Sequence, residues 1–126
     1  WCTASGKLYL ASLPPDQLER VLPRLPLQRM ARNTLTDLSA LRDDLARVRE
    51  EQLGTDSEEF IDGMVACAVP VRDANGELLA CLFSHAPVIR CSMAQLLAFV
   101  PRLRAAASEL EAVLGSAAAL EADQST

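Results

Sequence analysis

Two short apolar stretches joined by a turn sequence constrain the fold of this chain more than any other feature. Residues 65–71 are small, branched and mostly uncharged, and residues 77–84 are again largely apolar. Between them lies the sequence Asp73-Ala74-Asn75-Gly76. Asparagine and glycine tolerate the positive φ angles of a tight turn, and apolar stretches on both sides of such a pair are typical of a β-hairpin. The sequence therefore predicts an antiparallel hairpin with two buried strands.

A long amphipathic helix is predicted after the hairpin, over residues 92–114, and we expect it to cover one face of the sheet. Ser92 and Gln95 match a capping box at its start. Its apolar side consists of residues spaced by three and four: Leu96, Val100, Leu103, Ala107, Leu110 and Leu114. Pro101 removes one backbone hydrogen bond and should bend or restart the helix. Residues 116–126 are predicted to form a C-terminal tail, either a frayed continuation of the helix or a disordered segment.

Two further helices are predicted before the hairpin. The first is short: it opens at Pro14-Pro15-Asp16 and ends at Pro23. The second begins after Asp37, which is a suitable N-cap, and Gly54 is expected to close it. Its apolar side repeats at helical spacing, whereas its charged side is expected to be solvated surface.

Size and charge limit the possible classes of protein. A chain of 126 residues with 50% hydrophobic residues can bury one modest core, which fits a single domain. Its formal net charge of −5 argues against direct DNA binding, because phosphate contacts require clustered Lys and Arg. No apolar stretch approaches the roughly 20 residues of a membrane span, and the start does not resemble a signal peptide. We therefore expect a soluble, cytoplasmic domain without membrane contacts.

Cysteine and histidine residues are too few and too irregularly spaced to predict a metal or redox motif. Cys2, Cys67, Cys81 and Cys91 include no C-x-x-C pair, and His85 is the only histidine. Free, mostly buried thiols are the simplest interpretation. A catalytic triad would depend on His85 alone, and no nucleophile is paired with a base in a known motif. We therefore predict neither an enzyme nor a bound cofactor.

Several short segments, in this order, resemble the effector-binding domain of the isocitrate lyase regulator (IclR) family of bacterial transcriptional regulators. These segments are Thr3-Ala4-Ser5-Gly6-Lys7 with Leu10-Ala11, Asn33-Thr34-Leu35-Thr36-Asp37, Asp56-Ser57-Glu58-Glu59-Phe60 with Gly63, and Ala68-Val69-Pro70-Val71. They are similar to the family patterns T/S-A-x-G-K-x-x-L-A, x-T-x-T-D, D-x-E-E-x-x-x-G and A-x-P-V. The resemblance extends from about residue 3 to residue 114.

This resemblance implies a GAF/PAS-like α/β (α+β) fold, in which helices flank an antiparallel sheet. Residues 1–115 would form the effector-binding domain, and earlier strands of that domain would be missing. It also implies a homodimer or homotetramer that contacts DNA only through an absent N-terminal winged helix-turn-helix. Binding of a small organic acid would then shift the arrangement of the oligomer. The unpaired sheet edge or a helix face is expected to promote self-association.

The resemblance also implies where the effector binds. In the family a small carboxylate is held by backbone N–H groups of the A-x-G-K segment, by the Asp of the D-x-E-E segment, by a Cys on the next strand and by two Ser on the last hairpin strand. The corresponding positions here are Ala4 and Ser5, Asp56, Ala66, Phe83 and His85. Ala66 replaces the Cys, and Phe83 and His85 replace the serines. These departures favour a larger, more aromatic acid than glyoxylate.

Some residues near this site have alternative interpretations. His85 offers a hydrogen-bond donor or a positive charge to a carboxylate, but a lone histidine near a strand end is more often a structural residue. Strand alternation places Cys81 on the same face as His85, so a thiol or metal sensor built from Cys81, His85 and Asp56 is the alternative function. Glu58 and Glu59 are expected to point apart and to act as caps or surface charges.

Overall fold

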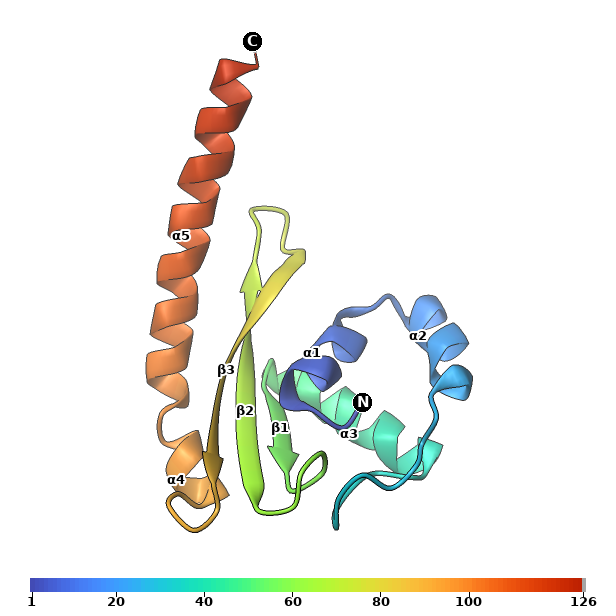
Figure 1. Cartoon of the computed structure of the whole chain (residues 1–126). Helices are drawn as coiled ribbons and strands as arrows, with labels where there is room; N and C mark the ends of the chain where they lie inside the picture. Colours follow the sequence, from blue (N-terminus) through green and yellow to red (C-terminus); the bar gives the residue numbers. More distant parts are fainter. Residues whose placement is uncertain (126) are drawn as a thin grey trace.

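The structure, a computed structural model, describes residues 1–125, so Thr126 at the end of the predicted tail lies outside the described residues. Three short helices or helical turns come first: α1 (Ala4–Ser12), α2 (Pro15–Val21) and the 3-10 turn η1 (Leu22–Arg24). They are followed by α3 (Leu38–Glu51), β1 (Gly54–Ser57), β2 (Met64–Arg72), β3 (Leu78–Pro87), α4 (Met93–Leu97) and α5 (Val100–Gln124). Helices lie on both faces of one sheet, which agrees with the predicted fold class (Figure 1).

The predicted hairpin forms the centre of the sheet. The strand order is β1-β2-β3, and both pairings are antiparallel. In the turn, Gly76 has a φ of +78°, and the side chain of Asp73 accepts hydrogen bonds from the N–H groups of Asn75 and Glu77. β2 is largely buried, whereas β3 is only half-buried. The prediction of two buried strands was therefore wrong for β3, because β3 lies at the edge of the sheet that residues 1–125 form and α4 and α5 pack mainly over β2.

One face of the sheet packs against α1, and α3 packs against α1. The core on this side joins Leu8 and Leu10 of α1 to Leu41 and Leu45 of α3, with Ala68 on the sheet. The buried face of α1 includes Lys7 and the small residues Ala4 and Ala11 beside Leu8, so it does not form a strongly apolar stripe. This is why apolar periodicity did not reveal it as a separate helix.

The opposite face packs against α4 and α5. Val65 and Cys67 of β2 contact Leu96, while Val69 and Val71 contact Ala107. α4 ends at Leu97 and α5 restarts at Val100, which confirms the predicted interruption near Pro101. α5 continues through Gly115 to Gln124 and extends beyond the sheet, so the tail continues the helix through residue 124 (Figure 1).

The end of α3 differs from the prediction. The helix ends at Glu51, and Gln52, rather than Gly54, adopts the left-handed C-cap conformation with a φ of +53°. Gly54 instead begins β1, where its Cα lies against the backbone of Ala4. No helix within residues 1–125 is both long enough and apolar enough to cross a membrane.

Candidate functional site

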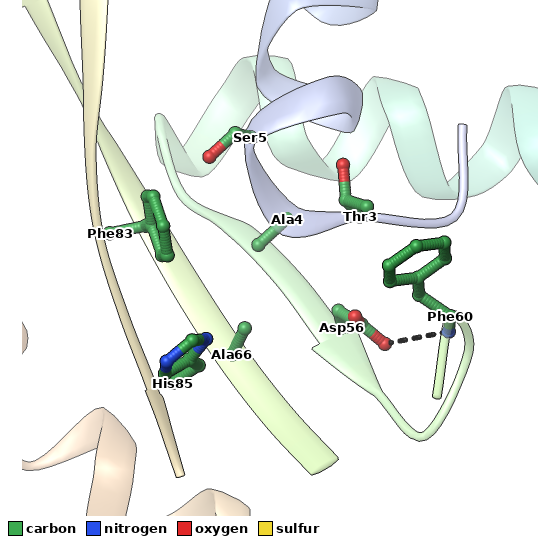
Figure 2. Close-up of a pocket in the computed structure, with 8 residues that line it drawn as sticks. All are labelled: Thr3, Ala4, Ser5, Asp56, Phe60, Ala66, Phe83 and His85. Atoms are coloured by element: carbon green, nitrogen blue, oxygen red, sulfur yellow. Dashed lines mark hydrogen bonds between the residues drawn. The ribbon is translucent and has the colours of Figure 1, made fainter. Parts of the chain in front are cut away.

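The predicted effector-binding residues line a single cavity of about 340 Å³. Its lining consists of Thr3, Ala4, Ser5, Asp56, Phe60, Ala66, Phe83 and His85. Phe83 and His85 lie on one side, Asp56 and Phe60 lie on the other, and Ala66 lies between them (Figure 2). All six predicted positions are therefore brought together from α1, β1, β2 and β3.

The register of the sheet explains the floor of this cavity. Asp56 pairs with Ala66, and Ala66 pairs with His85, so the three residues form one row across the strands. Neighbouring strands lie about 4.8 Å apart, so two polar residues flank a methyl group at a separation of roughly 10 Å. The small side chain of Ala66 leaves the space between them open.

The first turn of α1 has unpaired backbone donors in residues that line the cavity. Thr3 is the N-cap: its hydroxyl accepts the N–H of Gly6 and its carbonyl accepts the N–H of Lys7. Within residues 1–125, the N–H groups of Ala4 and Ser5 donate no hydrogen bond. Both residues line the cavity, and free N–H groups at a helix start favour anions.

Asp56 is buried and holds the loop that follows β1. One of its carboxylate oxygens accepts the N–H of Glu59 at 2.8 Å and the N–H of Phe60 at 3.4 Å. Burial raises the pKa of Asp56 above its ordinary value, although these hydrogen bonds and the charge of Lys7 oppose the shift. Asp56 therefore shapes one wall of the cavity in addition to lining it (Figure 2).

Two aromatic rings make the cavity largely apolar. Phe83 contacts His85 edge to face, with ring centroids 5.7 Å apart. Phe60 was not predicted to line the cavity, nor was Thr3. Both lie near predicted residues in the sequence: Thr3 is the cap of the helix that contains Ala4, and Phe60 ends the loop that begins at Asp56. For Phe60, its place in that loop is the only sequence signal that could have predicted it.

The geometry does not support the alternative metal or thiol sensor. Asp56 and His85 lie on strands separated by β2, and Cys81 lies four residues from His85 along β3. Cys81 packs against α1, with its sulfur 3.8 Å from the carbonyl oxygen of Ser5, and burial raises the pKa of its thiol. Within the described residues, no group of three His, Cys, Asp or Glu side chains is arranged to hold a metal ion.

Glu58 contacts Arg32 and Glu59 contacts Lys7, so the two side chains point apart as expected. The expectation of a surface charge was wrong for Glu59. Its side chain is buried, and one carboxylate oxygen lies 2.6 Å from the ammonium nitrogen of Lys7. Lys7 is itself 1% exposed and also contacts Asp44 on the charged side of α3. Glu59 is therefore not a surface charge, and the charged side of α3 is not entirely solvated. No apolar pattern signals such a cluster, because its members are distant in sequence and individually resemble surface residues.

Comparison of the sequence with known proteins identifies related regulators. Residues 1–112 match the model of the family described as bacterial transcriptional regulator IclR C-terminal. The chain is 43% identical over 109 residues to the probable transcriptional regulator SauR of Cupriavidus necator, covering 86% of this chain and 43% of SauR. It is 35% identical over 115 residues to the regulator KdgR of Escherichia coli, covering 91% of this chain and 44% of KdgR. The chain thus spans less than half the length of these relatives, which are named as regulators and not as enzymes.

Solved structures with the same fold include complexes with aromatic acids. A double mutant of the inducer-binding domain of PobR from Acinetobacter, in complex with 3-hydroxybenzoic acid, superposes with a TM-score of 0.82 at 30% identity, covering 87% of this chain and 63% of that one. An IclR homologue from Microbacterium hydrocarbonoxydans, in complex with 4-hydroxybenzoate, superposes with a TM-score of 0.76 at 30% identity, covering 88% and 44%. The chain therefore belongs to the IclR family of bacterial transcriptional regulators, and its residues 1–112 correspond to the C-terminal ligand-binding domain of that family.

Proposed function

We propose that this chain binds a small aromatic carboxylic acid in the cavity between α1 and the sheet. The observation that carries the proposal is the pairing of apolar walls with free backbone donors. Phe60, Ala66 and Phe83 offer surfaces to a ring, while the N–H groups of Ala4 and Ser5 offer donors to a carboxylate. The volume of about 340 Å³ is at the small end of ligand pockets and suits a single-ring acid.

The proposed pose follows from this polarity. The carboxylate lies at the start of α1, and the ring extends over Ala66 toward Phe83 and His85. His85 lies at the opposite end from Asp56 of the row of paired residues 56, 66 and 85. There its imidazole can form a hydrogen bond with a polar substituent on the ring or with the carboxylate of the ligand. The hydroxybenzoates bound by two related proteins have this combination of carboxylate, ring and second polar group.

The proposed consequence of binding is a change in an oligomer that carries DNA-binding domains. The relatives are named as transcriptional regulators and are about twice as long as this chain. The acidic domain itself is poorly suited to DNA, so DNA contact is assigned to a segment outside it. We infer that the ligand favours one arrangement of a homodimer or homotetramer in the cytoplasm, and light scattering with and without ligand tests this assembly.

Isothermal titration calorimetry with a short series of acids tests the ligand class. We expect 4-hydroxybenzoate and 3-hydroxybenzoate to bind more tightly than glyoxylate, because only the aromatic acids contact the phenylalanine walls. Phenol and benzyl alcohol are matched controls, since they keep the ring and lack the carboxylate. Equal binding of glyoxylate and 4-hydroxybenzoate, or no binding of any acid, would contradict the proposal.

Phe83→Ala is expected to weaken binding of 4-hydroxybenzoate about fivefold, because one aromatic wall is removed. Leu79→Ala is the matched control. Leu79 is on the same strand and is 52% exposed, compared with 53% for Phe83, but it does not line the cavity. Calorimetry gives the affinity of both variants for 4-hydroxybenzoate. It thereby distinguishes the loss of the Phe83 contact from a general effect of truncating a side chain on β3. A similar loss in the two variants would show that Phe83 does not contact the ligand.

His85→Ala is expected to weaken binding of 4-hydroxybenzoate about threefold, because one hydrogen bond to the ligand is lost. Glu109→Ala, on the exposed side of α5, serves as the control. Titration of both variants with benzoate, which lacks the second polar group, locates the contact. Unchanged affinity of His85→Ala for both acids would show that the imidazole is structural.

A further inference from the structure

Lys7 is a buried lysine that joins three segments of the domain. Its ammonium nitrogen lies 2.6 Å from Oε2 of Glu59, 2.6 Å from Oδ2 of Asp44 and 2.9 Å from the carbonyl oxygen of Thr55. The contact with Thr55 is a hydrogen bond, whereas the contacts with Glu59 and Asp44 are ion pairs without hydrogen-bond geometry. The three oxygens belong to α3, to β1 and to the loop between β1 and β2.

The two carboxylates depend on Lys7 to different degrees. Asp44 also accepts two hydrogen bonds from Arg47, at 2.8 and 3.0 Å. Burial alone would raise the pKa of Asp44, but Lys7 and Arg47 together lower it. For Glu59, burial outweighs the opposing effect of Lys7, and its pKa is raised. Within residues 1–125, Lys7 is the only cation paired with Glu59, so loss of Lys7 would leave Glu59 unpaired and Asp44 still paired.

The contacts of Lys7 lie next to residues that line the cavity. Thr55 precedes Asp56, and Glu59 precedes Phe60. The N–H of Glu59 also donates to Asp56, which ties the two sides of this loop together. Lys7 itself lies three residues after Ala4 on α1, about one helical turn from the free N–H groups. The Lys7 ammonium group therefore connects two walls of the cavity. One is the loop that contains Asp56 and Phe60 (the loop wall), and the other is the first turn of α1 (the helix wall).

We propose that Lys7 is a positioning residue for the ligand cavity, which fixes the loop of Asp56 and Phe60 at a set distance from the start of α1. A buried ion pair adds little net stability relative to apolar replacements, but an unpaired buried charge is costly, so arrangements that separate the pair are strongly disfavoured. The proposal rests on the proposed function only in assigning a ligand to the cavity. The geometry of the two walls can be tested without a ligand.

Amide hydrogen exchange, measured by NMR on the ligand-free chain, provides this test. In Glu59→Ala the amide of Phe60, which donates to Asp56, is expected to exchange about tenfold faster. Asp44→Ala is the matched control: it removes the other carboxylate partner of Lys7 but lies on α3, which does not line the cavity. There the amide of Phe60 should change less than about twofold. Glu59→Gln keeps an acceptor for Lys7 and should recover most of the protection.

Two patterns of exchange would overturn the proposal. One is equal acceleration of the Phe60 amide in Glu59→Ala and Asp44→Ala. The other is equal acceleration at Phe60 and at Leu96, whose amide lies in α4 on the opposite face of the sheet and reports overall stability. Either pattern would show that the cluster only stabilises the fold.

A double substitution extends the test to ligand binding. Lys7→Met with Glu59→Leu removes the buried pair and leaves Asp44 bonded to Arg47, so the domain should still fold. We expect its affinity for 4-hydroxybenzoate to fall about tenfold, because a small displacement of one wall misplaces the contacts. Wild-type affinity in a folded double variant would overturn the proposal. Failure of the unmodified chain to bind any aromatic acid would instead contradict the proposed function, and the exchange results would still decide the role of Lys7.

Discussion

Ala66→Leu is expected to abolish binding of 4-hydroxybenzoate, with a loss of affinity of at least about 100-fold, while the domain remains folded. Ala66 lies in the middle of the cross-strand row between Asp56 and His85, and its methyl group is the floor of the cavity. Three further carbon atoms at this position would occupy the space assigned to the ring. Because that space is open rather than packed with protein, the larger side chain should not force the core apart.

Two companion variants show whether the loss is local. Ala66→Ser preserves the open space and should bind within a few-fold of the unmodified chain. Ala68→Leu places the same large side chain two residues along β2, where Ala68 is fully buried in the core beside α1. It should lower the free energy of unfolding by about 1–3 kcal/mol through overpacking. Calorimetry and thermal unfolding distinguish these outcomes, and wild-type binding by Ala66→Leu would show that the cavity is not the ligand site.

The sequence predicted correctly the turns and helix starts that depend on only a few neighbouring residues. The Asn75-Gly76 turn, the Asp37 cap and the capping box at Ser92 all occur where expected, because each needs only a few neighbouring residues. The end of α3 could not be predicted in the same way. Gln52 closes the helix in a left-handed conformation, while its amide oxygen accepts a hydrogen bond from Arg72 on β2. That tertiary contact is not visible in the local sequence.

The cavity was predicted largely through the resemblance to a family, and the register of the sheet explains why the residues meet. Positions 56, 66 and 85 are far apart in sequence but form one row once three strands pair. Composition and periodicity do not specify that register. The same limit explains why Lys7 and Glu59 were missed: a charged residue in a helix or loop is usually exposed, and only the packed structure shows this pair to be buried.

Gly54→Ala is expected to have the largest effect on stability of any single methyl group added to this chain. A Cβ at Gly54 would overlap the carbonyl oxygen of Ala4, and it would lie only 3.0 Å from the carbonyl carbon of that residue. Both neighbours are backbone atoms, so no side chain can move aside. α1 would have to shift away from β1, with a loss of about 3 kcal/mol in the free energy of unfolding. Urea denaturation measures this loss.

Gly115→Ala supplies the opposite case, because it adds the same methyl group in the middle of α5, where no atom lies within 4 Å. Alanine is the better helix former, so the free energy of unfolding should rise by about 0.5–1 kcal/mol. The two glycines also differ in their relation to the site. Ala4 supplies both the carbonyl that contacts Gly54 and one of the free N–H groups in the cavity, so displacement of α1 should weaken 4-hydroxybenzoate binding in Gly54→Ala and leave it unchanged in Gly115→Ala. If Gly54→Ala instead unfolds at the same urea concentration as the unmodified chain and binds the acid equally well, then α1 is not held against β1 as described, and the helix wall of the cavity must be reassigned.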